Sequence, residues 1–221
     1  MSPFSGSLNS SRMSPIARSS GKVVSVVPRS FYERAPDIVA RALLGKVIAR
    51  QWKGERLAGR IVEAEAYFGE QDPAAHAYIG RTARNAVLFG PPGIAYVYFI
   101  YGMYYCLNIS CEPDGQAGCV LIRALEPVEG LGTMTRLRKL PPNSKPRLLT
   151  SGPGRLCQAL DITRSAHNGV DVTQPSSALH IEDDGYEPEN IRTTPRIGIR
   201  HAAEMPARFL IDKNKFVSTD K

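Results

Sequence analysis

The chain has 221 residues, of which 43% are hydrophobic and 22% are charged, so it can bury one sizeable core and favours a single domain. Its 28 lysine and arginine residues against 21 aspartate and glutamate residues give a formal net charge of +7, which suits a polyanionic partner such as nucleic acid. Because no apolar run approaches the roughly 20 residues of a membrane-spanning helix, the composition argues against a membrane protein.

The first residues differ in composition from the rest. Residues 1–20 are rich in serine, carry Arg12 and Arg18, and contain no acidic residue. They lack the apolar core of a secretory signal, so we do not expect one. The composition is typical of a disordered tail and also of an organelle transit peptide. We therefore expect residues 1–22 to be a tail or transit-like segment and residues 23–221 to form the folded domain.

The folded part is expected to begin with a helix and a hairpin. Pro36 suits the first turn of a helix and Gly45 can end it, which predicts a helix over residues 35–44. Two strands, over residues 46–52 and 56–68, should then flank a short loop of hairpin length.

The rest of the chain reads as a mixture of strands and helices. Five further strands are expected, over residues 95–101, 103–110, 119–124, 178–182 and 209–211. Two helices are expected over residues 127–138 and 153–160, and an irregular surface loop over residues 141–146. The pattern predicts the α+β class, as a single mixed domain with a largely antiparallel, curved β-sheet, surrounding helices and a protruding β-hairpin.

The strand over residues 56–68 contains the first candidate chemistry. Alternation places Glu63, Glu65 and Tyr67 on one face. Burying two carboxylates is costly unless they are paired or used, although the same pattern is also typical of a solvated outer face. A carbohydrate hydrolase built on Glu63 and Glu65 is a further alternative, but neighbouring positions on one strand are poorly placed to flank a sugar from opposite sides.

Aromatic residues and a histidine follow this strand. A loop of small residues returns His76 towards the same face, where it could orient a substrate or serve only as a structural histidine. Tyr96 and Tyr98 share one face of the next strand, and Tyr101 comes where two strands should reverse. Such an aromatic tip can act as a wedge between base pairs, and Tyr67 and Tyr98 could enclose a flipped base. The alternative is that these tyrosines are core residues or cross-strand pairs.

The cysteines argue against a metal site. Cys106, Cys111, Cys119 and Cys157 form no CxxC pair and have no histidine nearby at metal-ligand spacing. We therefore expect buried free thiols.

Four separated blocks of sequence carry a resemblance. They read RIVEAEAY (residues 60–67), AAH (residues 74–76), YVYFIYGMYYCLNIS (residues 96–110) and VLIRALEP (residues 120–127). Together they resemble the alkyladenine (3-methyladenine, or methylpurine) DNA glycosylase family, and several blocks in the right order are far more specific than one short motif. SGPGRLCQAL and PRIGI, at residues 151–160 and 195–199, extend the resemblance towards the C-terminus.

The resemblance implies an enzyme of base-excision repair. It would flip alkylated or deaminated purines out of double-stranded DNA and hydrolyse their N-glycosidic bond, with neither a metal nor an organic cofactor. The substrate class comprises 3-methyladenine, 7-methylguanine, hypoxanthine and ethenoadenine. Because no lysine lies in the blocks around Glu65 and His76, water is the expected attacking group and no strand cleavage is expected.

The resemblance also implies roles for single residues in the chemistry and in DNA distortion. Glu65 corresponds to the general base, and Arg123 and the backbone carbonyl of Ile199 would help it to hold the water. Tyr101 corresponds to the residue that enters the minor groove, and Met103 would support it.

Pocket residues and phosphate contacts complete the expected site. The resemblance implies that Tyr67, His76 and Tyr98 form the pocket walls, and that the amide of Asn108 discourages undamaged guanine. Five basic residues are our candidates for phosphate contacts, with ordinary surface charge as the alternative: Arg81, Arg84, Arg155, Arg196 and Arg200.

The expected partner is a DNA duplex that contains a damaged purine. The expected location is inside the cell with the DNA, in the nucleus or nucleoid. If the tail is a targeting peptide, the location could instead be an organelle. We expect a monomer because a lesion has no two-fold symmetry for a dimer to match. A DNA-binding module without catalysis is the main alternative. In such a module Glu65 and Arg123 would be expected to be replaced by other residues, yet both are present.

Overall fold

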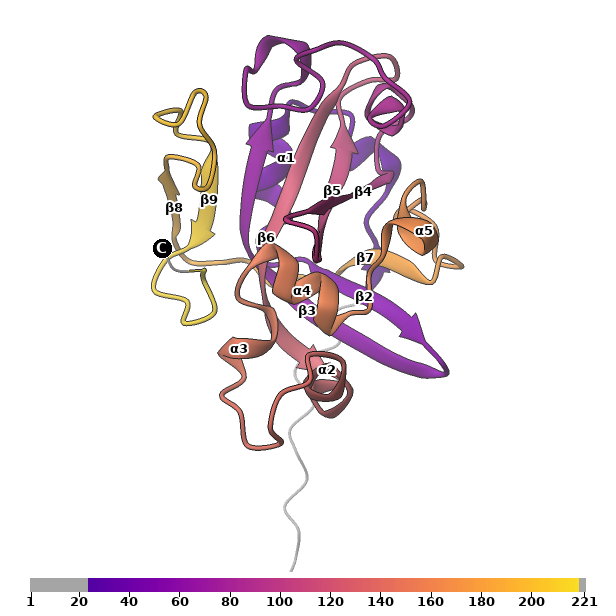
Figure 1. The fold of residues 1–221 in the computed structure, drawn as a ribbon, viewed down its shortest axis with the longest axis vertical. Helices are drawn as coiled ribbons and strands as arrows, with labels where there is room; N and C mark the ends of the chain where they lie inside the picture. Colours follow the sequence, from indigo (N-terminus) through magenta and orange to yellow (C-terminus); the bar gives the residue numbers. More distant parts are fainter. Residues whose placement is uncertain (1–23, 219–221) are drawn as a thin grey trace, which may run out of the picture.

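The structure is a computed structural model that describes residues 24–218. The expected tail, residues 1–22, lies outside the described residues. Within the described part, one open sheet of nine strands forms the centre of the molecule, and all of its paired neighbours run antiparallel (Figure 1). The predicted α+β class is confirmed.

The main path through the sheet has seven strands. Their order is β1 (Ser25–Val26), β7 (Leu179–Asp183), β2 (Val47–Trp52), β3 (Glu55–Tyr67), β6 (Gly118–Glu129), β5 (Tyr104–Cys111) and β4 (Ala95–Ile100). Two further strands, β8 (Ile191–Thr194) and β9 (Arg208–Ile211), extend the sheet beside the second half of β3. β2 therefore covers one edge of β3 as far as Arg60, and β9 takes over that edge from Glu63 to Glu65.

The helices are short. They are α1 (Pro36–Leu43), α2 (Leu131–Leu137), α3 (Arg147–Thr150), α4 (Pro153–Ala159) and α5 (Arg164–His167), with 3-10 turns at Arg29–Phe31, Gly69–Gln71 and Ala86–Phe89. Pro36 occupies the first turn of α1, as its fixed φ favours. α2 and α3 lie at one end of the sheet, and the segment between β3 and β4 lies at the other end (Figure 1).

Two cores use opposite faces of the sheet. The larger core combines side chains of α1 and α4 with alternate strand residues such as Ala64, Leu107 and Ile122. The smaller core lies under the segment between β3 and β4 and contains Tyr96 and Cys119. Alternation along β3 therefore directs Ala64 to the helices and the residues on either side of it to the other face.

Most predicted elements are confirmed within one or two residues. The predicted helix over residues 127–138 is wrong at its start, because residues 127–129 continue β6 and Gly130, with φ of 78°, turns the chain into α2. The hairpin loop between β2 and β3 has two residues, Lys53 and Gly54, both with positive φ. This is the turn geometry that matches the twist of two antiparallel strands.

Three further features concern the loop over residues 141–146, the cysteines and the helices. Residues 141–146 contain neither a helix nor a strand, as expected. All four cysteines are buried free thiols. Within residues 24–218, no helix has the length and hydrophobicity to cross a membrane.

Candidate active site

Glu65 lies in a row of paired residues that crosses the sheet. It pairs with Leu121 of β6, Leu121 pairs with Asn108 of β5, and Asn108 pairs with Tyr96 of β4. Side chains of directly paired residues lie on the same face of an antiparallel sheet. One face therefore presents Glu65, Asn108 and Tyr96 together, although Glu65 lies 31 positions before Tyr96 and 43 positions before Asn108 in the sequence.

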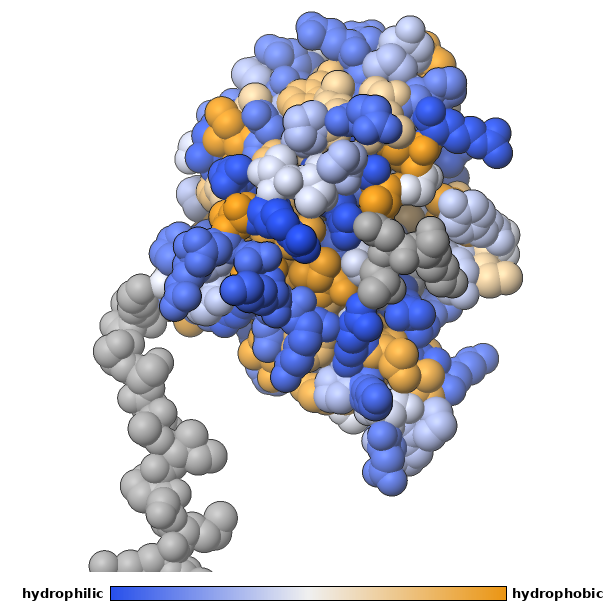
Figure 2. Space-filling view, turned by 90° about the vertical axis from the view of Figure 1, so that its left-hand side faces the viewer, coloured by the Kyte–Doolittle hydropathy of each residue, from blue (hydrophilic) through white to orange (hydrophobic). Residues whose placement is uncertain are grey.

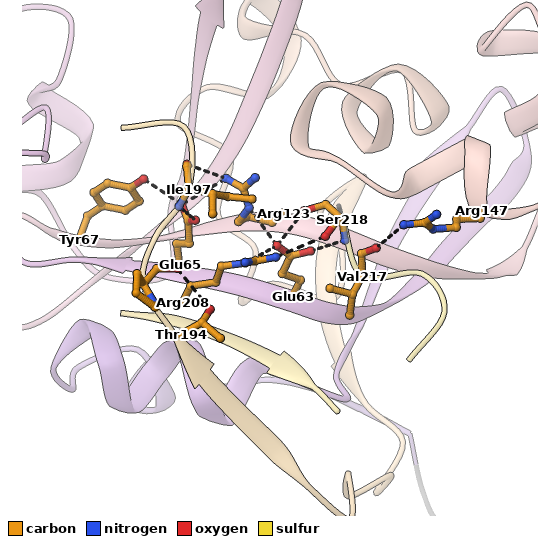
Figure 3. Close-up of polar contacts among 11 residues, drawn as sticks. Glu63, Glu65, Tyr67, Arg123, Arg147, Thr194, Ile197, Arg208, Val217 and Ser218 are labelled. Carbon is orange, nitrogen blue, oxygen red and sulfur yellow. Dashed lines mark hydrogen bonds and ion pairs between the residues drawn. The ribbon is translucent and has the colours of Figure 1, made fainter. Parts of the chain in front are cut away.

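The carboxylate of Glu65 is fully buried and held by three donors (Figure 3). Its Oε1 accepts a hydrogen bond from the backbone N–H of Ile197 at 2.9 Å. Its Oε2 accepts hydrogen bonds from the hydroxyl of Tyr67 at 2.9 Å and from Nη1 of Arg123 at 3.3 Å. The guanidinium and two neutral donors offset the cost of burying the carboxylate, so the alternative of a solvated outer face is wrong.

Tyr67 acts as a donor to Glu65. Burial and the negative charge of Glu65 raise the pKa of Tyr67 well above its usual value, so its hydroxyl keeps its proton at any physiological pH. The guanidinium of Arg196 lies over the ring, with its central carbon 4.7 Å from the ring centroid. Both contacts hold the ring beside Glu65.

The backbone group that contacts Glu65 belongs to Ile197, and the role of the Ile199 carbonyl in holding the water stays a prediction. Besides the N–H of Ile197 on Glu65, the carbonyl of Ile197 lies 3.5 Å from Nη1 of Arg123. The side chain of Arg196 is anchored to the carbonyl of Ala66 at 3.0 Å, which brings the next residue over Glu65. Gly198, with φ of 76°, then turns the chain before Ile199.

Glu63 is a second buried carboxylate with different partners. It accepts hydrogen bonds from Nε of Arg123 at 3.1 Å, from Nε of Arg208 at 2.8 Å, and from both the N–H and the hydroxyl of Ser218 at 2.6 and 2.8 Å. Both of its oxygens are thus engaged by protein donors. The arrangement gives no support to a carbohydrate hydrolase that uses Glu63 and Glu65 on opposite sides of a sugar.

His76 and Tyr98 lie together on the face that carries Glu65. Nδ1 of His76 is 2.9 Å from the hydroxyl of Tyr96, and the rings of His76 and Tyr98 meet edge to face with centroids 4.5 Å apart. Burial and the positive charge of Arg84 lower the pKa of His76, which favours the neutral imidazole. Tyr67 and Tyr98 both pack against the smaller core, so the three expected wall residues share one side of the sheet.

Asn108 is buried beneath these rings. Its amide nitrogen donates to the carbonyl of Tyr96 at 3.2 Å, and this bond fixes the orientation of the amide. Tyr96 itself is a core residue with 2% exposure, as the alternative interpretation of the tyrosine cluster expects.

The hairpin of β4 and β5 ends in an exposed apolar tip. Its loop consists of Tyr101, Gly102 and Met103, between the paired residues Ile100 and Tyr104. The exposed fractions are 76% for Tyr101 and 62% for Met103, so neither side chain belongs to the core. Tyr101 also has φ of 52°, in a backbone region that residues other than glycine seldom adopt. The strained backbone holds the ring outward.

The expected phosphate contacts divide into two groups. Arg196 is buried and binds Asp72 through both terminal nitrogens, at 2.9 Å for Nη2, so its assignment as a phosphate contact is corrected: the guanidinium has a carboxylate partner and no access to a backbone phosphate. Arg81, Arg84 and Arg200 are exposed and Arg155 is half-buried.

Two surface hollows lie away from Glu65. One, of about 640 Å³, lies between α1 and the pair β8 and β9, and is lined by residues such as Ile38, Met205 and Phe209. The other, of about 500 Å³, lies beside the hairpin between Phe99 and Arg164. On the side of the molecule that carries β8 and β9, hydrophobic side chains are interspersed with hydrophilic ones (Figure 2).

Three residues whose side chains take part in this arrangement were not predicted from the sequence: Asp72, Arg208 and Ser218. Arg208 and Ser218 lie 145 and 155 residues from Glu63 along the chain, and no local pattern links them. For Asp72 a signal exists, because a single aspartate before a proline in a loop that returns to a strand often organises that loop.

Comparisons with known proteins identify the family. The family described as methylpurine-DNA glycosylase matches residues 30–215. A protein of Koribacter versatilis named "Putative 3-methyladenine DNA glycosylase" is 55% identical over 201 residues, which cover 91% of this chain and 97% of that protein. Proteins with the same name from Methanocella arvoryzae and Burkholderia lata are 53% and 48% identical, over 86% and 87% of this chain and 93% and 91% of their own lengths. The chain therefore belongs to the methylpurine-DNA glycosylase family and is a DNA glycosylase, a hydrolase of DNA repair.

Proposed function

We propose that the protein removes damaged purines from double-stranded DNA by hydrolysing the N-glycosidic bond, with Glu65 as the general base for the attacking water. The observation that carries the proposal is the placement of Glu65: a buried carboxylate with one guanidinium partner, on the same sheet face as the rings of His76 and Tyr98. The substrate class is 3-methyladenine, 7-methylguanine, hypoxanthine and ethenoadenine.

The reaction needs a negative charge at the sugar. As the C1′–N bond breaks and its electron pair leaves with the base, positive charge develops on the sugar, and a nearby carboxylate stabilises it. Glu65 also accepts a proton from water while the water oxygen bonds to C1′. Arg123 holds the carboxylate in place. A backbone carbonyl would help to orient the water: the resemblance to the family implies that of Ile199, and the carbonyl of Ile197 lies 3.5 Å from the same guanidinium nitrogen.

The hairpin supplies the means to extrude the base. An apolar ring that enters the duplex replaces stacking that is lost when a nucleotide leaves the helix, and Tyr101 is the most exposed ring of this hairpin at 76%. Met103 flanks it on the same loop. Damaged or mispaired bases cost less to unstack, by part of the few kcal/mol that extrusion of an intact base needs, so flipping itself favours lesions.

The extruded base would be selected between aromatic walls. Tyr67, His76 and Tyr98 supply these walls, and the amide of Asn108, fixed by the carbonyl of Tyr96, would oppose the exocyclic amino group of undamaged guanine. Because Glu65 has no exposed surface, the nucleotide must displace some of the groups that cover it, which include Tyr67 and the segment at Ile197.

The remaining features of the proposal concern binding. Arg81, Arg84, Arg155 and Arg200 would contact phosphates. The donors that hold Glu65 are a guanidinium, a hydroxyl and a backbone N–H, and none is an amine able to form a Schiff base, which supports hydrolysis without strand cleavage. We propose that the enzyme acts as a monomer, inside the cell with the DNA.

Product analysis tests the proposal. The enzyme is incubated with duplexes that each carry one lesion, and with an oligosaccharide as the control substrate. Release of free hypoxanthine or 3-methyladenine with an intact sugar–phosphate strand supports the proposal. Binding of the duplexes without release of any base would identify a binding module instead, and release of sugar from the oligosaccharide would identify a carbohydrate hydrolase.

A further inference from the structure

Glu63 is joined to the proposed base by a shared guanidinium. Arg123 donates from Nε to Glu63 at 3.1 Å and from Nη1 to Glu65 at 3.3 Å (Figure 3). A guanidinium is planar and rigid, so fixing the direction of one N–H fixes the others. The contact with Glu63 therefore sets the angle at which Nη1 meets Glu65.

The C-terminal segment holds Glu63 in turn. Ser218 donates twice to Glu63, and its carbonyl accepts from Nη2 of Arg208 at 3.3 Å. Arg147 secures the same segment through the carbonyl of Val217 at 3.1 Å. These contacts leave Glu63 without freedom to rotate, since both of its oxygens are bonded and it has no exposed surface.

The buried ionic groups around Glu63 carry equal numbers of positive and negative charges. Glu63 and Glu65 face the guanidiniums of Arg123 and Arg208, whose side chains are 11% and 6% exposed. Neutralising Glu63 would leave two guanidiniums beside one carboxylate. Arg123 would then lose one of the two carboxylates that fix the direction of its guanidinium.

We propose that Glu63 is a positioning residue for base excision: it holds Arg123 so that Nη1 reaches Glu65, and Ser218 holds Glu63. The inference rests on the proposed role of Glu65. A purely structural role for Glu63 would lower stability or DNA binding, whereas a positioning role lowers the rate of the chemical step and acts only through Arg123.

The test is a double-mutant cycle on single-turnover release of hypoxanthine from an inosine-containing duplex. We expect Glu63→Gln to lower the rate about tenfold or more while the Kd for the same duplex changes less than about threefold. In the Arg123→Gln background, the same substitution should change the rate less than about twofold, because residues that act through one another are not additive. Equal rate losses in both backgrounds, or equal losses of rate and affinity, would overturn the inference.

Two further variants keep the test decisive if Glu63→Gln does not fold. Ser218→Ala removes one of the donors to Glu63 and should lower the rate about two- to fivefold, again only when Arg123 is present; an unchanged rate would overturn the inference. Asp184→Asn is the matched control, because it breaks an ion pair with Arg60 on the same strand and should leave the rate unchanged. If the wild-type enzyme releases no base, the proposed function itself fails; if it does and Glu63→Gln is as fast, only the positioning role fails.

Discussion

The guanidinium of Arg196 lies over the ring of Tyr67 while its terminal nitrogens bind Asp72. Asp72 also accepts two backbone N–H bonds within the loop that leads to His76. The contact therefore joins three parts of the candidate site: the ring on β3, the loop with His76, and the segment with Ile197. Both charged side chains have no exposed surface.

Breaking this buried pair should destabilise the fold. We expect Arg196→Met to lower the free energy of unfolding by about 3–5 kcal/mol, because it leaves the Asp72 carboxylate buried without its partner. Urea unfolding measures the change. Arg192→Met is the control, since the pair of Arg192 with Asp212 is largely exposed on the arginine side and should contribute less than about 1 kcal/mol. Similar losses in both variants would contradict the importance of burial here.

The same pair should make stability depend on pH. Burial raises the pKa of Asp72, but hydrogen bonds from Arg196, Ala74 and Phe68 outweigh it, so the pKa lies below its usual value. A lowered pKa in the folded state stabilises the protein above the unfolded-state pKa of about 3.9, and this stabilisation is lost as pH falls through the folded-state pKa.

We therefore expect the stability difference between the wild type and Asp72→Asn to be largest at neutral pH and to shrink below about pH 4. Urea unfolding at several pH values between neutrality and the acid range measures it. A difference that is independent of pH would show that the carboxylate charge of Asp72 does not stabilise the fold.

The exposed ring at the hairpin tip should matter for lesion capture and not for folding. Tyr101→Ser removes a stacking surface worth about 1–3 kcal/mol, so we expect binding of a lesion duplex to weaken roughly 5- to 150-fold. Tyr186→Ser, at an exposed ring beside Arg60, should bind like the wild type. Base fluorescence of the flipped nucleotide reports the effect directly. An unchanged flipped fraction in Tyr101→Ser would exclude the wedge.

DNA binding should weaken with salt through the exposed arginines. Each phosphate contact contributes about −0.9 to the slope of log K against log salt concentration. Arg84→Gln or Arg200→Gln should therefore reduce the magnitude of the slope by about one, whereas Arg192→Gln, on strand β8, should not change it. Titrations of an undamaged duplex at several salt concentrations give the slopes. Identical slopes for all variants would argue against these two contacts.

Local sequence patterns predicted the elements that hold Glu65 and Tyr101. Alternation on β3 and the tight turn between β4 and β5 follow from short-range backbone geometry, and both are present. Alternation also indicated two glutamates on one face, but it could not distinguish a solvated face from a buried one, because burial depends on the distant segments at Ile197 and Ser218 that cover them.

The contacts that the sequence did not predict have a common physical origin. Arg196 looks like any other basic residue in a sequence, and only the fold brings Asp72, which lies 124 residues away, against it. Ile197 and Ile199 are likewise indistinguishable by residue type, and only the fold shows that the N–H of Ile197 contacts Glu65, 132 residues away. Such long-range pairing is a property of the tertiary structure and leaves no periodic signal along the chain.

Glu65→Gln tests the account most directly, because glutamine keeps the size of the side chain and removes its negative charge and basicity. We predict that this variant binds an inosine-containing duplex as tightly as the wild type. In a single turnover it should release hypoxanthine about 10² to 10⁴ times more slowly, which is the usual contribution of a positioned base. A variant that excised the base at the normal rate would contradict the role of Glu65 and the reaction proposed here.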